Sequence, residues 1–401
     1  MRRVEKIAGA LALFLGMTGV ASFGQGPPPP PPPLGQPFPN LTRAELARWR
    51  MGQGAFLQPA SVPAGLGPVF NEAACVQCHG GLKTAPAIGG SGPELVTRFG
   101  RVVGGQFDPM LALGGPSIQS KGIGRFNGVN FVGEVVPPQA TIVAHRRTTA
   151  LFGLGLVDAV PDAALMALSA YQHQANPRTA GVVSTIGDPV SGQERVGRFG
   201  WKAQEPTLAA FAADALVNEL GVTTPALPDE NAPQGNASLL AANPAKNHPN
   251  QPTNLMVLQL ADFMTFNAPP PPAPPTRTSL AGQALFGLIG CAQCHQPTLQ
   301  AGPSPSAAIN GVVFAPYSDF LLHDMGRLGD GIAQGSASTT QMRTAPLWGL
   351  RYEIAFLHDG RAQTLDQAIL DHQGQGAAAA HNYSTLNPAL KAQLVAFLNS
   401  L

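Results

Sequence analysis

Apolar residues recur at helical spacing in four parts of the chain. The spacing predicts helices over residues 255–263, 280–289, 365–372 and 390–401. Three of them begin at residues that commonly cap helices: Asn254 precedes the first, Thr364 with Gln367 is a capping-box pair, and Asn387 precedes a first-turn proline. Long alternation of apolar and polar residues, which would predict strands, is absent. The pattern therefore predicts a mainly α fold with long irregular loops.

Composition indicates that side-chain burial alone does not hold this fold together. Charged residues make up 12% of the 401 residues, about half the ~25% of ordinary soluble domains. Gly and Pro are abundant at 46 and 40 residues, while hydrophobic residues at 44% still supply a sizeable core, enough for two or three domains. The formal net charge is +1 and no run rich in Lys or Arg occurs, which excludes an extended basic surface for nucleic acid.

The first residues have the pattern of a secretory signal. Arg2, Arg3 and Lys6 form a positive start, and residues 7–21 form an apolar stretch followed by small residues. A membrane anchor is the alternative, but a spanning helix needs about 20 apolar residues, and this stretch is shorter and contains three glycines. We expect cleavage near residues 21–24, export of the mature chain to the periplasm, and no stable membrane span.

All four cysteines fall in two copies of one short motif. The copies read Cys75-Val76-Gln77-Cys78-His79 and Cys291-Ala292-Gln293-Cys294-His295, which is the signature for covalent attachment of c-type haem. Two residues between the thiols let both sulfurs reach the vinyl groups of one porphyrin, and the histidine becomes the proximal iron ligand. A four-thiolate zinc site, two local disulfides and a thioredoxin-like motif are the alternatives. The first two leave both histidines unexplained, and the third needs a βαβ pattern that is absent. The sequence therefore predicts two covalently bound haems.

Two proline-rich segments indicate where the parts of the chain begin and end. Seven consecutive prolines predict an extended spacer within residues 25–40, and a second cluster predicts an inter-domain linker at residues 269–276. One cysteine motif lies on each side of that linker. After a signal peptide at residues 1–24, we therefore expect an N-terminal cytochrome c-like haem domain with insertions at residues 41–268. A C-terminal cytochrome c domain follows at residues 277–401.

The ligand on the distal side of each iron decides whether a haem carries electrons or reacts, because an iron with an open position binds peroxide or dioxygen. For the second haem, His358 is the first candidate and His323 the second. Each is followed by Asp, which can fix the tautomer of a ligand. The weaker candidates are Met325, Met342 and His372, with His145 for the first haem.

Three further residues are weak candidates for a catalytic role. Trp201 could carry electrons between the haems, although an ordinary packed aromatic is the simpler alternative. Glu205 and Glu219 follow it in the sequence and could act as distal acid–base groups that assist O–O cleavage. The simpler alternative for both is a solvated surface glutamate.

Several segments that occur in a fixed order make the chain similar to a known family. They are residues 65–71 ahead of the first cysteine motif (GLGPVFN), then 151–158, 197–203, 321–326, 343–350 and 357–361. On these residues, which span about 41–401, the chain resembles the di-haem oxidoreductase family of di-haem peroxidases and thiol oxidoreductases. That family is related to bacterial di-haem cytochrome c peroxidases, so the resemblance implies one electron-accepting haem and one peroxidatic haem.

The same resemblance bears on the sixth ligand of the second haem. The bacterial peroxidases commonly have methionine in that role, just before a His-Asp-Gly triplet. In this chain the triplet is His358-Asp359-Gly360 and the preceding residue is Leu357, which cannot bind iron. The departure is one reason to favour His358 as the distal ligand.

These observations together predict an exported di-haem c-type oxidoreductase, peroxidase-like, with one electron-relay haem and one reactive haem. The expected partners are a small redox protein or a quinol-linked electron donor, and peroxide or another small oxidant. Two other functions stay open at this stage. One is a non-catalytic electron-transfer cytochrome, and the other is a di-haem oxygenase that acts on an organic substrate.

Overall fold

The computed structural model describes residues 34–81, 87–245 and 249–401. The predicted signal peptide at residues 1–24 and residues 25–33 of the predicted spacer lie outside the described residues. No helix in the described part of the chain is long and apolar enough to cross a membrane.

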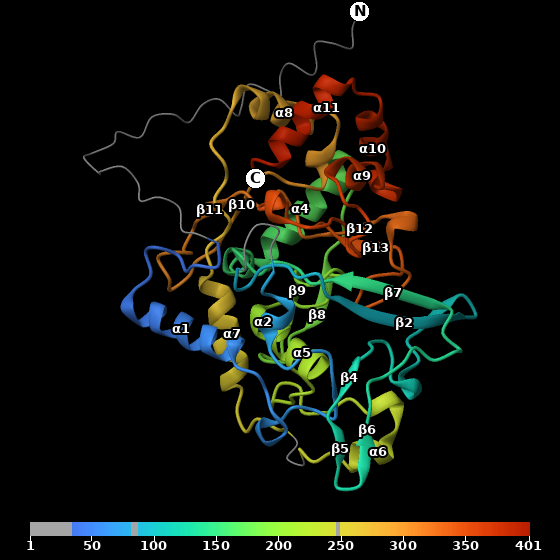
Figure 1. The fold of residues 1–401 in the computed structure, drawn as a ribbon. Helices are drawn as coiled ribbons and strands as arrows, with labels where there is room; N and C mark the ends of the chain where they lie inside the picture. Colours follow the sequence, from blue (N-terminus) through green and yellow to red (C-terminus); the bar gives the residue numbers. More distant parts are fainter. Residues whose placement is uncertain (1–33, 82–86, 246–248) are drawn as a thin grey trace, which may run out of the picture. The chain divides into compact units, whose positions relative to one another are not determined.

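Helices and strands alternate irregularly along the chain (Figure 1). The helices are α1 Arg43–Leu57, α2 Cys75–Cys78, α3 Leu154–Asp158, α4 Asp162–Ala175, α5 Leu208–Leu220, α6 Ala237–Ala241, α7 Leu255–Phe266, α8 Arg277–Leu288, α9 Leu365–Leu370, α10 Ala377–Ser384 and α11 Pro388–Leu398. The strands are β1 Val69–Phe70, β2 Leu95–Val103, β3 Gln106–Asp108, β4 Lys121–Gly122, β5 Gly124–Phe126, β6 Val129–Phe131, β7 Ile142–Arg147, β8 Ser184–Gly187, β9 Glu194–Gly197, β10 Leu299–Gln300, β11 Val313–Phe314, β12 Leu322–Asp324 and β13 Gln341–Arg343.

One helical core forms where α1 and α7 pack side by side, with α5 against α7 (Figure 1). Gly52 of α1 allows this close approach, because a Cβ there would lie 2.1 Å from the Gln259 carbonyl oxygen of α7. The Phe56 and Phe263 rings meet with centres 4.6 Å apart. Trp49 Nε1 donates a 2.9 Å hydrogen bond to Asn267 Oδ1 just beyond α7. Trp49, Phe56 and Phe263 belong to the largest apolar cluster among the described residues, and Cys75 of the first cysteine motif packs against that cluster.

A second core lies in the C-terminal part, where α8 packs on α11 in the same manner. Gly282 is the close-contact residue here, because a Cβ there would lie 2.0 Å from the Gln393 carbonyl oxygen. Phe286, Tyr317 and Phe397 meet edge to face, with ring centres 5.3–5.7 Å apart. Cys291 of the second motif packs against this cluster. Each cysteine motif thus lies against the crossing of two helices.

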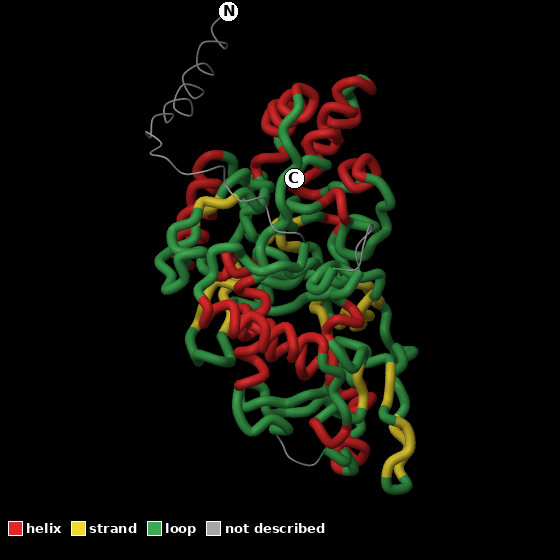
Figure 2. Tube along the Cα trace, turned by 60° about the vertical axis from the view of Figure 1, so that its left-hand side comes forward, coloured by secondary structure: helices red, strands yellow, loops and turns green. Residues whose placement is uncertain are grey.

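The strands make the prediction of a mainly α fold wrong, because the structure is 35% helical and 16% strand. They form several small antiparallel sheets of two or three strands. In the largest, β2 lies between β3 and β7, with Leu95 paired to Arg147 and Gly100 to Ile142. Apart from the nine residues of β2, the described strands are two to six residues long. Runs that short do not produce a detectable alternation in the sequence, and loops separate them along most of the chain (Figure 2).

The predicted helices are confirmed, with shifted ends and one wrong cap. Asn387 Oδ1 accepts the Leu390 amide at 3.0 Å, and Thr364 Oγ1 accepts the Gln367 amide at 3.2 Å. The helix after the linker is α8, which begins earlier than predicted because Thr276 caps it. The sequence also makes Asn254 a natural cap for α7, but its Oδ1 instead accepts the Ala226 amide at 3.1 Å. A loop contact therefore replaces the expected capping bond.

Candidate haem-binding sites

The first cysteine motif forms a single helical turn, α2. The Gln77 side chain fixes the entry to this turn, because its Oε1 accepts the amides of Ala73 and Ala74 at 3.0 and 2.8 Å. The His79 amide then closes the turn on the Cys75 carbonyl at 2.9 Å. Both thiols are free, and burial raises the pKa of Cys75 to about 12. One short turn therefore carries two neutral thiols and a histidine.

The His79 ring is held in one tautomer. Its Nδ1 lies 3.0 Å from the Thr149 carbonyl oxygen, and a carbonyl oxygen can only accept a hydrogen bond. Nδ1 therefore carries the proton and Nε2 carries the lone pair. Burial lowers the pKa of His79 to about 4, so the imidazole is neutral at pH 7. A neutral imidazole with a free Nε2, oriented by a carbonyl on Nδ1, is the usual form of a metal-ligating histidine.

The second motif repeats this arrangement on a different local structure. Cys291–Gln293 form a 3₁₀ turn, and the His295 amide donates to the Cys291 carbonyl at 3.0 Å. His295 Nδ1 lies 2.9 Å from the Tyr317 carbonyl oxygen, and burial lowers the pKa of His295 to about 4. The residue just before the second cysteine is again a glutamine whose side chain is held by hydrogen bonds. Gln293 Oε1 accepts from Asn176 and Thr179 at 3.0 and 2.7 Å. The anchoring role of Gln77 and Gln293 is not visible in the sequence motif alone.

Each motif lines its own cavity. Cys75, Cys78 and His79 line the first, and Cys291, Cys294 and His295 line the second, which has a volume of about 390 Å³. The four thiols therefore do not converge on one site, as a four-thiolate zinc centre would require. Within the described ranges, no three His, Cys, Asp or Glu side chains are grouped as metal ligands. The two separate cavities, each with two thiols and one oriented imidazole, fit one c-type haem apiece.

Trp201 lies in the wall that the two cavities share. It lines both of them, together with the segment Arg147, Thr148 and Thr149. The indole Nε1 donates a 2.9 Å hydrogen bond to the Arg147 carbonyl oxygen. The Trp201 ring also meets the His358 ring in an edge contact, with centres 6.2 Å apart. The residue that the sequence offered as an electron bridge is therefore fixed between the two sites.

A buried ionic cluster supports this wall. Asp330 accepts a hydrogen bond from Arg146 Nε at 2.7 Å and contacts Lys202 Nζ at 3.0 Å. The side chains of Arg146, Asp330 and Lys202 are 6%, 1% and 0% exposed. Arg146 belongs to β7, and Lys202 directly follows Trp201. The cluster therefore joins the β2–β7 sheet to the tryptophan segment.

Three carboxyl groups gather beside the first cavity. Glu219 and Asp214 line it from α5, and Glu205 couples electrostatically to Asp214. Burial raises the pKa of each of the three above its ordinary value. Glu219 Oε2 also accepts a 2.7 Å hydrogen bond from Asn71 Nδ2. The sequence reasoning missed Asp214, and it missed the buried Arg98 that also lines this cavity.

The candidate distal histidines differ in what occupies their ring nitrogens. His323 Nε2 pairs with Asp319 at 2.9 Å, and its Nδ1 lies 3.2 Å from Gln375 Oε1 and 3.5 Å from Cys294 Sγ. Although burial acts in the opposite direction, the Asp319 hydrogen bond raises the pKa of His323 to about 10. In this geometry His323 is a charged ion-pair partner.

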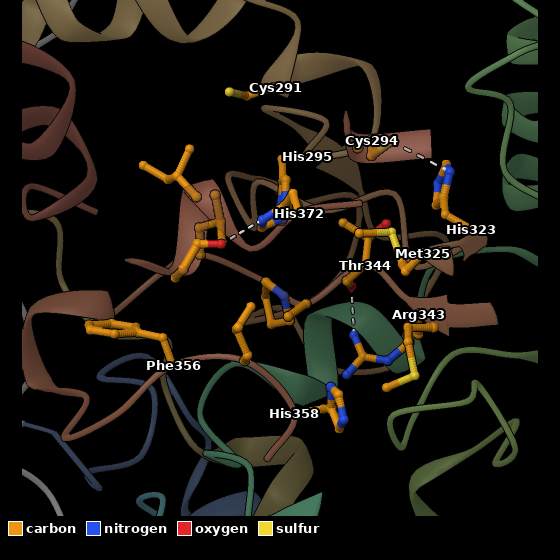
Figure 3. Close-up of a pocket in the computed structure, with 18 of the residues that line it drawn as sticks. Cys291, Cys294, His295, His323, Met325, Arg343, Thr344, Phe356, His358 and His372 are labelled. Carbon is orange, nitrogen blue, oxygen red and sulfur yellow. Dashed lines mark hydrogen bonds between the residues drawn. The ribbon is translucent and has the colours of Figure 1, made fainter. Parts of the chain in front are cut away.

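His358 is 4% exposed at the far wall of the second cavity (Figure 3). Its Nε2 lies 3.9 Å from Asp359 Oδ2, and its backbone carbonyl accepts the Arg147 amide at 2.6 Å. Leu357 before it adopts a left-handed φ of 68°. His145 is exposed on β7, where its Nδ1 meets Thr97 Oγ1 at 3.2 Å, and it is not among the lining residues of either cavity. Which of the predicted distal residues bind iron stays a prediction.

Comparison with known proteins gives one strong match. A family model described as "Di-haem oxidoreductase, putative peroxidase" matches residues 134–401, about two thirds of the chain. No curated protein sequence matches the chain.

Three solved structures are distantly similar to this chain. The diheme peroxidase BthA from Burkholderia thailandensis is 17% identical, over 92% of this chain and 87% of that chain, with a TM-score of 0.44. A MauG-like protein associated with microbial copper homeostasis is 13% identical, over 95% of both chains, with a TM-score of 0.40. Hydrazine synthase from Kuenenia stuttgartiensis is 14% identical, over 96% of this chain and 100% of that chain, with a TM-score of 0.40.

Proposed function

Because the chain belongs to the di-haem oxidoreductase family, we propose that it is an exported c-type cytochrome that reduces peroxide, using one relay haem and one reactive haem. The family confirms the resemblance seen in the sequence and the predicted oxidoreductase class. The observation that carries the finer proposal is the matched state of His79 and His295. Each donates its Nδ1 proton to a backbone carbonyl, which leaves the lone pair on Nε2, and each lies beside two free thiols.

In this proposal Cys75 and Cys78 hold the first haem and Cys291 and Cys294 the second, with His79 and His295 as proximal iron ligands. A haem supplies a site for peroxide where an axial position is open, and a store for one electron where both positions are filled. Reduction of one H₂O₂ to two waters takes two electrons and two protons. The electrons come from a small redox protein or a quinol-linked donor, so the residues of this chain must deliver protons and connect the two sites.

The first cavity suits the reactive haem. His79 is the one histidine among its described lining residues, whereas the second cavity is lined by His295, His323, His358 and His372. A carboxyl group whose pKa is raised keeps its proton to higher pH and can pass it to a nearby oxygen. Glu219 and Asp214 are in that condition at the first cavity. We assign them to deliver the protons that peroxide oxygen needs, with Glu205 acting through Asp214.

Trp201 supplies the connection between the sites. Its indole lines both cavities and is fixed by the bond from Nε1 to the Arg147 carbonyl. Two residues further along that segment, the Thr149 carbonyl orients His79. A single backbone segment therefore sets the positions of the tryptophan and of the first proximal ligand.

Export is the remaining part of the proposal. The support is the charged start and the apolar stretch at residues 7–21. If the chain is exported, the mature protein recovered from the periplasmic fraction begins near residues 22–25. Recovery of the uncut chain in the cytoplasmic fraction would contradict it.

The peroxidase activity is tested by rapid mixing of the reduced holoprotein with peroxide. We expect two electrons to be consumed per H₂O₂, and we expect Cys75→Ser with Cys78→Ser to abolish the reaction while the second haem stays attached. Reduced protein that is not oxidised by peroxide, with both irons six-coordinate, would support the electron-carrier alternative. Oxidation by dioxygen that depends on an organic substrate would support the oxygenase alternative.

A further inference from the structure

His372 faces the second cavity from a position just beyond the end of α9. Its ring centre lies 6.4 Å from that of His295, and the two ring planes are inclined by 59°. Both residues line the same cavity, and Figure 3 shows their rings next to each other in its interior, with His358 at the opposite wall. Sequence spacing gave no reason to prefer His372, because a histidine at a helix end is commonly a surface group.

The tautomer of His372 is fixed in the same way as that of the two motif histidines. Its Nδ1 lies 2.7 Å from the Ala368 carbonyl oxygen one helical turn earlier. Since the carbonyl can only accept, Nδ1 carries the proton and Nε2 carries the lone pair. His79, His295 and His372 therefore share one arrangement, with a backbone carbonyl oxygen at Nδ1 of each ring and the lone pair on Nε2.

The separation of His295 and His372 suits two ligands of one metal. An imidazole nitrogen binds a transition metal at about 2.0–2.1 Å, so two imidazoles on opposite sides of one metal have ring centres about 6 Å apart. The observed 6.4 Å agrees with this value. Direct stacking or a hydrogen bond between the rings would bring them closer, and no such bond joins these two described residues.

The other histidines of this cavity are less suitable. His323 has both nitrogens engaged, by Asp319 and by Gln375. His323 and His358 are only 2% and 4% exposed, whereas His295 and His372 both keep part of their surface exposed where they line the cavity. Gly376 leaves space for the His372 side chain, because a Cβ at position 376 would lie 3.1 Å from the Cβ and Cδ2 atoms of His372.

We propose that His372 is the second axial ligand of the haem held by Cys291, Cys294 and His295, which is therefore a bis-histidine haem. The assignment rests on the proposed function, which places a haem at this motif. A bis-histidine iron has no open position, so this haem stores and passes electrons. Histidine in place of methionine as the sixth ligand also lowers the potential of such a haem, and Leu357 stands where the related bacterial peroxidases commonly have their methionine ligand.

The test uses the full-length holoprotein in its oxidised state and reads the spin state of each haem by electron paramagnetic resonance and visible absorption. In the wild type we expect a low-spin bis-histidine signal. His372→Ala should remove that signal and produce a high-spin haem, while mass spectrometry still finds two haems per chain. Added imidazole should restore the low-spin signal in His372→Ala. His372→Met, which keeps a ligand and most of the volume, should give the near-infrared band of methionine-ligated ferric haem.

Two histidine variants serve as controls. His381→Ala changes an exposed histidine on α10, and His358→Ala changes the leading candidate from the sequence; both should keep the low-spin signal. The inference is overturned if His372→Ala stays low-spin, if His358→Ala becomes high-spin instead, or if the wild type already shows the methionine band. If the wild type carries no haem at Cys291 and Cys294, the proposed function itself fails, and this assignment fails with it.

Discussion

Replacing Asp330 by Asn should destabilise the protein strongly, because Asp330 is the anion of a buried cluster with two cations. The Arg146 and Lys202 side chains that contact it are 6% and 0% exposed. The amide introduced by the change keeps the volume and one acceptor oxygen but removes the negative charge. Both cations then stay buried without an ionic partner. Removing one partner of a buried pair in this way costs about 3–5 kcal/mol.

Arg146 and Lys202 respond differently to the loss of the Asp330 charge. This difference determines where the loss of stability lies within the range of about 3–5 kcal/mol. Burial lowers the pKa of Lys202 to about 8 even with Asp330 beside it. Without that carboxylate the pKa falls further, so in the variant Lys202 can lose its proton at pH 7 for less than about 1–2 kcal/mol. Arg146 cannot lose its proton at neutral pH, although burial lowers its pKa to about 10. We therefore expect a loss of about 3 kcal/mol at pH 7. The loss should be smaller at pH 9, where Lys202 is mostly neutral in both proteins.

The assay is urea unfolding of the oxidised holoprotein followed by far-UV circular dichroism at pH 7 and pH 9. The control is Arg101→Gln, which removes one partner of the exposed pair between Arg101 and Asp108, with side chains 43% and 34% exposed. It should cost less than about 1 kcal/mol. A loss below about 1 kcal/mol for Asp330→Asn, or a loss equal to that of Arg101→Gln, would refute the reasoning that the cluster supports the wall between the cavities.

Three further perturbations have defined outcomes. Burial raises the pKa of Glu230 to about 8, so the folded state holds a proton that the unfolded state releases near pH 4.5. Stability should therefore fall by about 3 kcal/mol between pH 5 and pH 8, and urea unfolding of Glu230→Gln should lack this component of the slope. Glu219→Gln keeps an acceptor for Asn71 but lacks the transferable proton. In rapid-mixing experiments it should slow the reaction with peroxide about 10²-fold or more, with the haem content unchanged. An unaltered rate would exclude Glu219 as a proton donor. Trp201→Leu should slow electron transfer from the second haem to the first, measured after flash reduction, with spin states unchanged. Equal rates in the variant and the wild type would remove Trp201 from the electron route.

Four of the described helices, α7, α8, α9 and α11, could be predicted from the sequence because they depend on local signals. Thr364 and Asn387 cap α9 and α11 through atoms within three residues, so the capping pattern is sufficient. Asn254 shows the limit of this reasoning, since its side chain bonds to Ala226, which is 28 residues away in the chain. The short strands could not be predicted because β2 and β7 pair over a long loop, and pairs such as β12–β13 are three residues long.

The candidate sites were predictable as far as covalent chemistry dictates spacing. Two thiols, one porphyrin and one proximal histidine require a five-residue motif, so the motif residues of both sites follow from the sequence. The carbonyls that orient the motif histidines belong to Thr149 and Tyr317, which are 70 and 22 residues away. The position of His372 depends on the direction of α9 relative to the second motif, and Asp214 reaches the first cavity only through the packing of α5. No sequence pattern records such tertiary relations.

Mass spectrometry of the denatured mature chain tests the central claim most directly, since a thioether-bound haem stays on the chain when the fold is lost. We expect the mass of the polypeptide plus two haems. Cys75→Ser with Cys78→Ser should retain one haem, at the second motif, and Cys291→Ser with Cys294→Ser should retain one at the first. A denatured wild-type chain with no attached haem, or with the same haem count in both cysteine variants as in the wild type, would contradict the account.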